Sequence, residues 1–261
     1  LHPRVRRQRQ MCIRDRIYLA PFAGSTKILK YNLDGTFVTD YDLGERLNKP
    51  KLSLNPDGSI SLVHLCFQGM SEMMGAVITP DSTITKYIPA PGQAINPRDK
   101  NGSFVGFNNE IWSYNNVEGF KYMMMPVDTL YNYNAAANKM EAQFALSNPP
   151  VGEDVFLIYD ELPGKYLATV WGKGTIVVDN KNNNSHYVKL VNDYFGGLPA
   201  PMNFTNGWFF AMYEPAVLME NIEKRMAASD CTDKDKELLK DLLGSLDEND
   251  NNVMFIGKLK K

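Results

Sequence analysis

Four aromatic side chains are the best candidates in this sequence for binding a ligand: Trp112, Tyr114, Trp171 and Trp208. They lie in or near the edges of expected short strands. Flat aromatic rings near Asn and Asp suit sugar binding, because rings stack on the sugar while amides and carboxylates bond to its hydroxyl groups. Large aromatic residues also pack between sheets, so that role stays open for all four.

No catalytic motif accompanies these residues. The chain has no GxSxG sequence, and beyond residue 16 its only histidines are His64 and His186. A Ser-His-Asp arrangement is assembled in space, so the two histidines keep that possibility open. Gly172–Thr175 (GKGT) lacks the GxxxxGK[ST] spacing of a phosphate loop and links two expected strands. We therefore expect a hairpin turn there, and no catalytic residue.

Metal ligands do not occur in the patterns that metal sites need. Asp247–Asn251 offers oxygen ligands at alternate positions, as an EF-hand loop does, but Asn252 replaces the glycine and Lys258 the final glutamate. Cys66 and Cys231 lie far apart, without a CxxC pair or a Cys/His cluster, which argues against zinc. The sequence predicts no metal and no cofactor.

The first 16 residues differ in composition from the rest of the chain. They hold six of the 28 basic residues and one of the 30 acidic ones, so the formal net charge of −2 understates how acidic residues 17–261 are. Such a segment could be an arm for nucleic acid or a mitochondrial presequence. The string MCIRDR at residues 11–16 instead resembles the translated sequencing adapter found at the ends of metagenomic reading frames. We favour this third interpretation, a non-native or disordered segment, and the acidic remainder argues against nucleic-acid binding.

Residues 17–261 are expected to form one β-rich domain. From Thr26 to Leu43, polar and apolar residues alternate on both sides of Asp34-Gly35, which is typical of two antiparallel strands around a hairpin turn. Further groups of short strands begin near Lys51, Ser103, Asp154 and Asn203. This spacing of roughly 50 residues is that of β-propeller blades.

The last fifth of the chain breaks the strand pattern. Leu218, Ile222 and Met226 recur every four residues, which predicts a helix. Thr232 is a suitable N-cap for a second helix, whose leucines form an apolar stripe. We expect a helical hairpin at about residues 215–246, inserted ahead of one final strand.

Three stretches together resemble a known family: TKILKYNLDGTFV, YNYNAAANKMEAQFAL and the ending LLGSLDENDNNVMFIGKLKK. They are similar to the six-bladed β-propeller proteins of Bacteroidetes with TolB-like or NHL-like repeats. The resemblance runs from about Ile17 to Lys261, and the ending is its most specific part. Since six blades need about 300 residues, it implies an all-β, six-bladed-type propeller that is truncated at the N-terminus and retains about five blades.

The resemblance also implies a function without catalysis. Members typically carry a lipoprotein-type signal peptide and have no established activity. The expected protein is therefore an exported binding or scaffold propeller of the cell envelope, in the periplasm or anchored at the outer membrane. Its partner would be a glycan, a peptide or an envelope protein, and it would reach the membrane only through a lipid anchor outside this sequence.

An enzyme is the alternative: a hydrolase or lyase with its active site at the central channel. Carboxylates clustered with His64 or His186 would favour the enzyme. An aromatic, charge-poor groove would favour binding. Fold alone cannot decide between the two, because function depends on the site that a fold carries.

Overall fold

The computed structural model describes residues 9–13, 16–106, 109–125, 127–147, 157–201 and 203–260. The chain divides into two compact units. The first consists of Leu1–Ser113 and Glu118–Pro149, and the second of Tyr114–Val117 and Pro150–Lys261. The second unit thus includes a short segment that lies, in sequence, inside the first.

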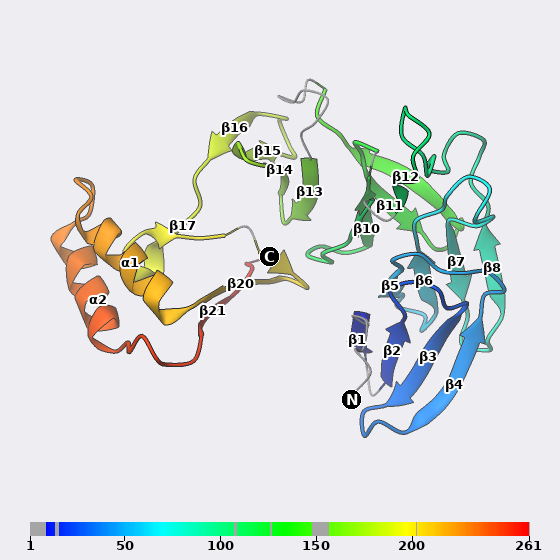
Figure 1. The fold of residues 1–261 in the computed structure, drawn as a ribbon, viewed down its shortest axis with the longest axis horizontal. Coiled ribbons are helices and arrows are strands. Elements are labelled where there is room, and N and C mark those ends of the chain that lie inside the picture. The colour runs from blue at the N-terminus through cyan, green and yellow to red at the C-terminus, as the bar shows by residue number, and fades with distance from the viewer. Residues whose placement is uncertain are drawn as a thin grey trace. The chain divides into compact units, whose positions relative to one another are not determined.

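The first unit contains three antiparallel sheets of four strands, in which strands that follow one another in sequence are neighbours (Figure 1). Blade 1 is formed by β1 (Arg9–Ile13), β2 (Arg16–Ala20), β3 (Lys27–Asn32) and β4 (Phe37–Asp42). Blade 2 is formed by β5 (Lys51–Leu54), β6 (Ile60–Val63), β7 (Gly75–Ile78) and β8 (Ile84–Tyr87). Blade 3 is formed by β9 (Ile111–Trp112), β10 (Phe120–Met124), β11 (Leu130–Asn134) and β12 (Lys139–Phe144).

The hairpin β3–β4 illustrates how the local sequence sets this fold. Gly35 has a φ of 85°, which glycine adopts without steric cost, and its amide donates to the carbonyl of Asn32 at 3.0 Å. The Asp34 carboxylate accepts a hydrogen bond from the Thr36 amide at 2.9 Å. These contacts confirm the turn predicted at Asp34-Gly35.

The core of the first unit lies between its blades. Ile28 of blade 1 packs in one cluster with Leu62 of blade 2, and Val77 of blade 2 packs in another with Tyr122 of blade 3. Every residue of β6 and β7 is buried, because blade 2 is covered on both of its faces. Face-to-face packing of successive sheets is the arrangement expected of propeller blades.

The second unit contains two further sheets and a short ribbon. Blade 4 is formed by β13 (Leu157–Leu162), β14 (Lys165–Val170), β15 (Gly174–Asp179) and β16 (Ser185–Val188). The ribbon pairs β17 (Val191–Asn192) with β18 (Leu198–Pro199) around the 3₁₀ turn η2 (Asp193–Phe195). Blade 5 has three strands, in the order β19 (Phe204–Thr205), β20 (Trp208–Tyr213) and β21 (Val253–Lys258).

Two helices are inserted between β20 and β21, as the sequence predicts. They are α1 (Pro215–Met226) and α2 (Asp233–Gly244). Leu218, Ile222 and Leu239 are buried in one cluster with blade 5, so the apolar stripes of both helices face that sheet. Neither described helix has the length and apolar character that crossing a membrane requires.

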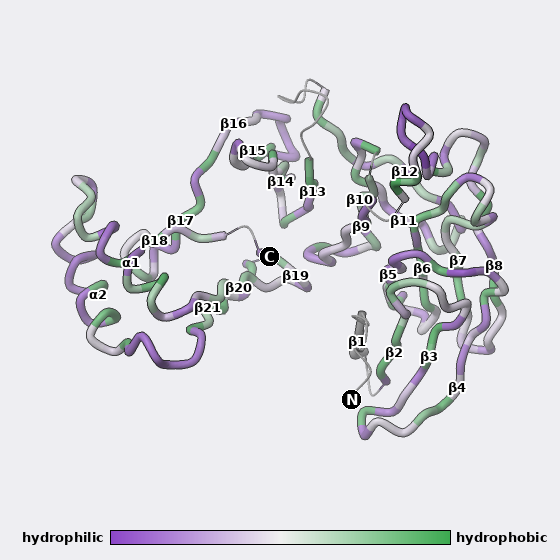
Figure 2. Tube along the Cα trace, viewed as in Figure 1, coloured by the Kyte–Doolittle hydropathy of each residue, from purple (hydrophilic) through white to green (hydrophobic). Residues whose placement is uncertain are grey.

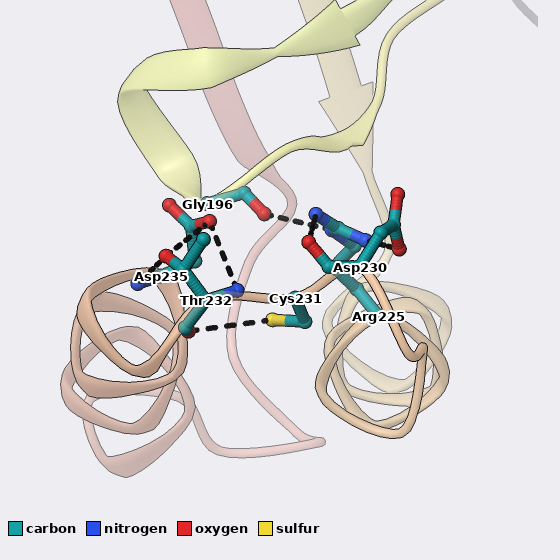
Figure 3. A network of polar contacts seen from close by, with 6 residues as sticks. All are labelled: Gly196, Arg225, Asp230, Cys231, Thr232 and Asp235. Atoms are coloured by element: carbon teal, nitrogen blue, oxygen red, sulfur yellow. Dashed lines mark hydrogen bonds and ion pairs between the residues drawn. The ribbon is translucent and has the colours of Figure 1, made fainter.

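Polar contacts fix the ends of the two helices (Figure 3). Arg225, in the last turn of α1, donates from Nε to the carbonyl of Gly196 at 2.9 Å and forms an ion pair with Asp230. At the start of α2, the Thr232 hydroxyl accepts from the Asp235 amide at 3.2 Å, and the Asp235 carboxylate accepts from the Thr232 amide at 3.4 Å. This capping box confirms the N-cap predicted at Thr232.

One predicted strand is wrong. Residues 103–106 form no strand, and an isolated bridge joins Phe104 to Arg98 instead. The Asp99 carboxylate accepts a hydrogen bond from the Ser103 amide at 2.9 Å, which closes a turn where the alternating pattern predicts an extended chain. Residue 107 of this prediction, and residues 154–156 of the strand predicted at Asp154–Tyr159, lie outside the described residues.

Strand β1 lies within residues 1–16, which the sequence sets apart from a domain beginning at Ile17. It pairs antiparallel with β2, with Met11 opposite Tyr18. A ladder needs only backbone amides and carbonyls, so a strand forms here without an alternating pattern of side chains. That residues 1–16 are an adapter artefact stays a prediction.

The sheets confirm the predicted fold class. Along the described residues, five blade sheets in a β-propeller arrangement make an all-β fold with two helices near the C-terminus. Turn chemistry and blade-sized spacing predicted it because each blade is built from contacts that are local in sequence.

Candidate binding surface in the second unit

The four aromatic residues that the sequence singles out belong to different elements of the two units. Trp112 is partly buried on β9 of the first unit, opposite Met123. Trp171 lies in the β14–β15 turn of blade 4, with 68% of its surface exposed. Trp208 begins β20 and is 45% exposed. Tyr114 lies in the segment of the second unit whose backbone is hydrogen-bonded to the β19–β20 turn, which precedes Trp208.

The segment Tyr114–Val117 is bonded to that turn through its backbone and one side chain. The Tyr114 carbonyl accepts from the Asn206 amide at 2.7 Å and from the Thr205 hydroxyl at 3.2 Å. The Asn116 Oδ1 accepts from the Gly207 amide at 3.0 Å. Asn206 and Gly207 have φ values of 52° and 76°, which an Asn-Gly pair adopts at the two central positions of a tight hairpin turn.

Asn116 also reaches blade 4. Its Nδ2 donates to Oδ2 of Asp160, on β13, at 2.8 Å. Burial raises the pKa of Asp160 to about 7, and the negative charge of Glu161 acts in the same direction, while the bond from Asn116 partly opposes the shift. The hydrogen bond between Asn116 and Asp160 therefore includes an ionisable group, and the charge of the Asp160 carboxyl changes near neutral pH.

Blade 5 exposes one of its faces. Five large apolar side chains, between 37% and 62% exposed, make up what we call the apolar face of blade 5: Trp208, Phe210, Met212, Met254 and Ile256. Cross-strand register places Phe210 opposite Ile256 and Met212 opposite Met254, so they point to the same side of the sheet. Figure 2 shows these hydrophobic strands beside the hydrophilic turn that follows α2. Contiguous exposed apolar residues of this kind mark interaction surfaces.

The opposite face of the same sheet is covered. Ala211 and Phe255 are buried there in one cluster with Leu218 and Ile222 of α1. The helical insertion therefore covers one side of β20–β21 and leaves the apolar face exposed. At one end of that face, Lys258 Nζ lies 5.8 Å from the centre of the Trp208 ring, a cation–π distance.

The two histidines that the sequence leaves open for catalysis belong to different units. His64 is fully buried in the first unit, and burial lowers its pKa to about 4. Burial likewise raises the pKa of Cys66 to about 11. His186 is exposed on β16, opposite Val177. Among the described residues, no three His, Cys, Asp or Glu side chains are grouped so that they could hold a metal ion.

The sequence predicts Trp208 but misses the other four members of the apolar face. Strand β20 reads WFFAMY, apolar at every position, so alternation gives no indication of which side is exposed. A signal was nevertheless present. A strand that is apolar on both sides predicts that both sides are covered, and the helical hairpin can cover only one.

One solved structure shares the fold, and two others are weaker matches. A protein of Bacteroides fragilis, named as a candidate exported protein, is 13% identical, and the match covers 94% of this chain and 75% of that one, with a TM-score of 0.56. The extracellular domain of a candidate one-component system from Bacteroides thetaiotaomicron matches with 14% identity over 73% of this chain and 23% of that one, at a TM-score of 0.40. An auxiliary nutrient binding protein of the same species matches with 10% identity. The match covers 66% of this chain and 38% of that one, at a TM-score of 0.37.

At 13% identity, the match to the protein of Bacteroides fragilis shows the fold alone. This chain spans well under half the length of the two proteins of Bacteroides thetaiotaomicron. No family model matches the chain, and no curated protein matches it.

Proposed function

We propose that this chain is an exported, non-enzymatic binding propeller of the cell envelope, and that it holds a polypeptide partner against the apolar face of blade 5. The observation that carries the proposal is the exposure of five large apolar side chains on a sheet whose other side is already buried. Burying one such side chain contributes about 1.5–3 kcal/mol before the costs of association. A partner covering several of them would therefore gain affinity chiefly from the hydrophobic effect.

A polypeptide suits this surface better than a glycan. Trp208 shares the face with Phe210 and Ile256, and Lys258 lies over the indole ring. Sugar hydroxyls lose hydrogen bonds to water when they are bound and need polar groups to replace them. Apolar side chains of a protein have no such need. Trp112, Tyr114 and Trp171 stay predicted ligand-binding residues, outside this face.

Neither of the two histidines favours a hydrolase or lyase. His64 is buried with a pKa of about 4, and His186 belongs to the outer strand of blade 4. A general base needs both access to substrate and a pKa near the working pH.

Export is the second part of the proposal. It is supported by the fold shared with a candidate exported protein and by the family resemblance. A six-bladed, TolB-like ring and a lipid anchor belong to the same proposal and rest on the resemblance alone. When the complete gene is expressed in its host, the protein should be found in the envelope fraction, and recovery from the cytosol would contradict export.

Binding is tested with a displayed library of extended peptides, and with soluble glycans as the competing class. Peptides selected on the purified chain should bind at least about tenfold more weakly to Phe210→Ser, roughly the loss of 1.4 kcal/mol. Tyr187→Ser is the matched control, because Tyr187 is 54% exposed on blade 4 and lies outside the apolar face. Glycan binding that depends on Trp208, with no peptide selected, would overturn the choice of partner.

A further inference from the structure

Blade 5 is one strand narrower than the other blades. Blades 1 to 4 have four strands each, whereas blade 5 has three strands among the residues that the structure describes. All six residues of β21 pair with β20 on one side, and no strand in the described part of the chain pairs with the other side. Within the described residues, β21 is therefore an open edge, six residues long.

The backbone groups at this edge can be assigned. The Leu259 amide donates to the Gly207 carbonyl at 2.9 Å, so this pair is a hydrogen-bonded one. Hydrogen-bonded and non-hydrogen-bonded pairs alternate along antiparallel strands, so the backbone groups of Phe255 and Gly257 also bond to β20. The amides and carbonyls of Met254 and Ile256 then point away from β20, toward the open edge.

The outer strands of blades 1 to 3 carry charges that discourage pairing with a further strand, whereas β16 of blade 4 carries none. Asp40 and Asp42 lie on β4, Lys86 on β8, and Lys139 and Glu141 on β12. Strand β21 has no charged residue from Val253 to Gly257. A long, apolar and uncharged edge is a template for pairing with another strand.

Charge changes sign from one end of β21 to the other. Exposed Asp247, Glu248 and Asp250 precede the strand, and exposed Lys258 and Lys260 lie at its far end. When two such strands pair antiparallel, the acidic end of each meets the basic end of the other. A parallel pair would bring like charges together, which is unfavourable. The edge is thus complementary to itself in one orientation, as a two-fold interface must be.

We propose that β21 is a homodimer edge, at which a second copy of this chain adds its own β21 in antiparallel orientation. The two three-stranded blades then form one six-stranded sheet. In the register centred on Phe255, Met254 of one copy lies opposite Ile256 of the second copy. Directly opposed residues share a side of the sheet, so the two apolar faces become continuous. This inference does not depend on the proposed function.

The dimer is tested by sedimentation equilibrium of the purified chain. An edge of six residues buries less surface than a standard interface, so we expect a dissociation constant in the micromolar range. Ile256→Pro removes one outward amide per copy and leaves the bonds to β20 intact. Losing two hydrogen bonds per dimer should weaken association by about 30-fold or more.

A matched variant separates edge pairing from damage to the fold. Tyr187→Pro changes an exposed residue of β16, the outer strand of blade 4. The Asp179 amide donates to the Asn184 carbonyl at 2.9 Å, which fixes the alternation of hydrogen-bonded and non-hydrogen-bonded pairs between β15 and β16. By that alternation the Tyr187 amide also points away from the neighbouring strand. Tyr187→Pro should leave the dimer unchanged. Circular dichroism of both variants checks that each one folds.

Charge reversal gives a test that does not alter the backbone. The double variant Lys258→Glu, Lys260→Glu should be monomeric, and so should Asp247→Lys, Asp250→Lys. Mixed together, the two should form a heterodimer, because their ends are again complementary. A wild-type chain that is monomeric at millimolar concentration, or a dimer that persists in folded Ile256→Pro and in both charge variants, would overturn the proposal.

Discussion

Asn116 donates from Nδ2 to Oδ2 of Asp160 at 2.8 Å, while its Oδ1 accepts from the Gly207 amide at 3.0 Å. One side chain thus links β13 of blade 4 to the β19–β20 turn of blade 5. Because burial raises the pKa of Asp160 to about 7, this link gains or loses a charge near neutral pH. Its contribution to stability should depend on pH.

Replacing Asp160 by Asn is expected to stabilise the protein above pH 7. The pKa of Asp160 is about 7 in the folded protein against an ordinary value of 3.8, so the folded state binds the proton more tightly. The contribution of Asp160 is then greatest below pH 4 and declines as the pH rises from about 4 to 7. Asn does not ionise, so Asp160→Asn should gain ~2–4 kcal/mol over wild type near pH 8 and little near pH 4. Urea unfolding at both pH values measures the difference, and a gain that is the same at both would contradict the prediction.

Asn116→Asp removes the Nδ2 donor of Asn116 and so tests what the hydrogen bond to Asp160 contributes to stability. The new carboxylate still offers an acceptor to the Gly207 amide but faces Asp160 with a second negative charge. We expect a loss of ~2–3 kcal/mol near pH 8, and less near pH 5, where Asp160 is protonated and can donate. Asn182→Asp is the control, since the Oδ1 of Asn182 also accepts from a backbone amide, at 2.9 Å from Asn184, in an exposed turn. Equal losses in the two variants would show that the donor to Asp160 is unimportant.

His64 should make the first unit sensitive to acid. Burial lowers its pKa from 6.5 to about 4, so the folded state resists protonation. The contribution of neutral His64 to the free energy of unfolding is fully present above pH 6.5 and is lost as the pH falls toward 4. The variant His64→Asn retains an acceptor for the Asn48 amide, which now bonds to Nδ1 at 3.3 Å. Between pH 6.5 and pH 4, the free energy of unfolding of His64→Asn should therefore fall by ~2–3 kcal/mol less than that of the wild type. Urea unfolding measures this difference. His186→Asn, at an exposed site, should leave the acid sensitivity unchanged.

Thr232→Ala should destabilise α2 by about 1 kcal/mol, because it removes the side-chain cap of the Asp235 amide. The thermal unfolding midpoint measures the loss. Ser229→Ala removes a hydroxyl from an exposed position between the helices and should change the midpoint little. A similar loss in both variants would mean that the capping box contributes nothing specific.

Elements held by neighbouring residues were the predictable part of this fold. The hairpin turn at Asp34-Gly35 and the cap at Thr232 follow from side chains that bond to amides two or three residues away. The predicted strand at Ser103–Phe107 is wrong for the same reason. The Ser103 amide donates to the nearby Asp99 carboxylate, which forms a turn in place of a strand.

The candidate site was less predictable because its members are distant in sequence. Asn116 and Asp160 are separated by 44 positions, and neither belongs to a motif. Met254 and Ile256 join Phe210 and Met212 only because the helical insertion returns the chain beside β20. Exposure of one side of an apolar strand depends on what covers the other side, which spacing along the chain does not encode.

The segment Tyr114–Val117 belongs to the second unit, although β9 and β10 on either side of it belong to the first. No single break of the backbone can therefore release both units whole. A cut between residues 149 and 150 would leave on the amino-terminal fragment the four residues that the second unit needs. Fragments expressed separately should recognise each other as the halves of a split reporter do. A gene fragment encoding only the carboxy-terminal half would yield a product whose β19–β20 turn lacks the hydrogen bonds to Tyr114 and Asn116.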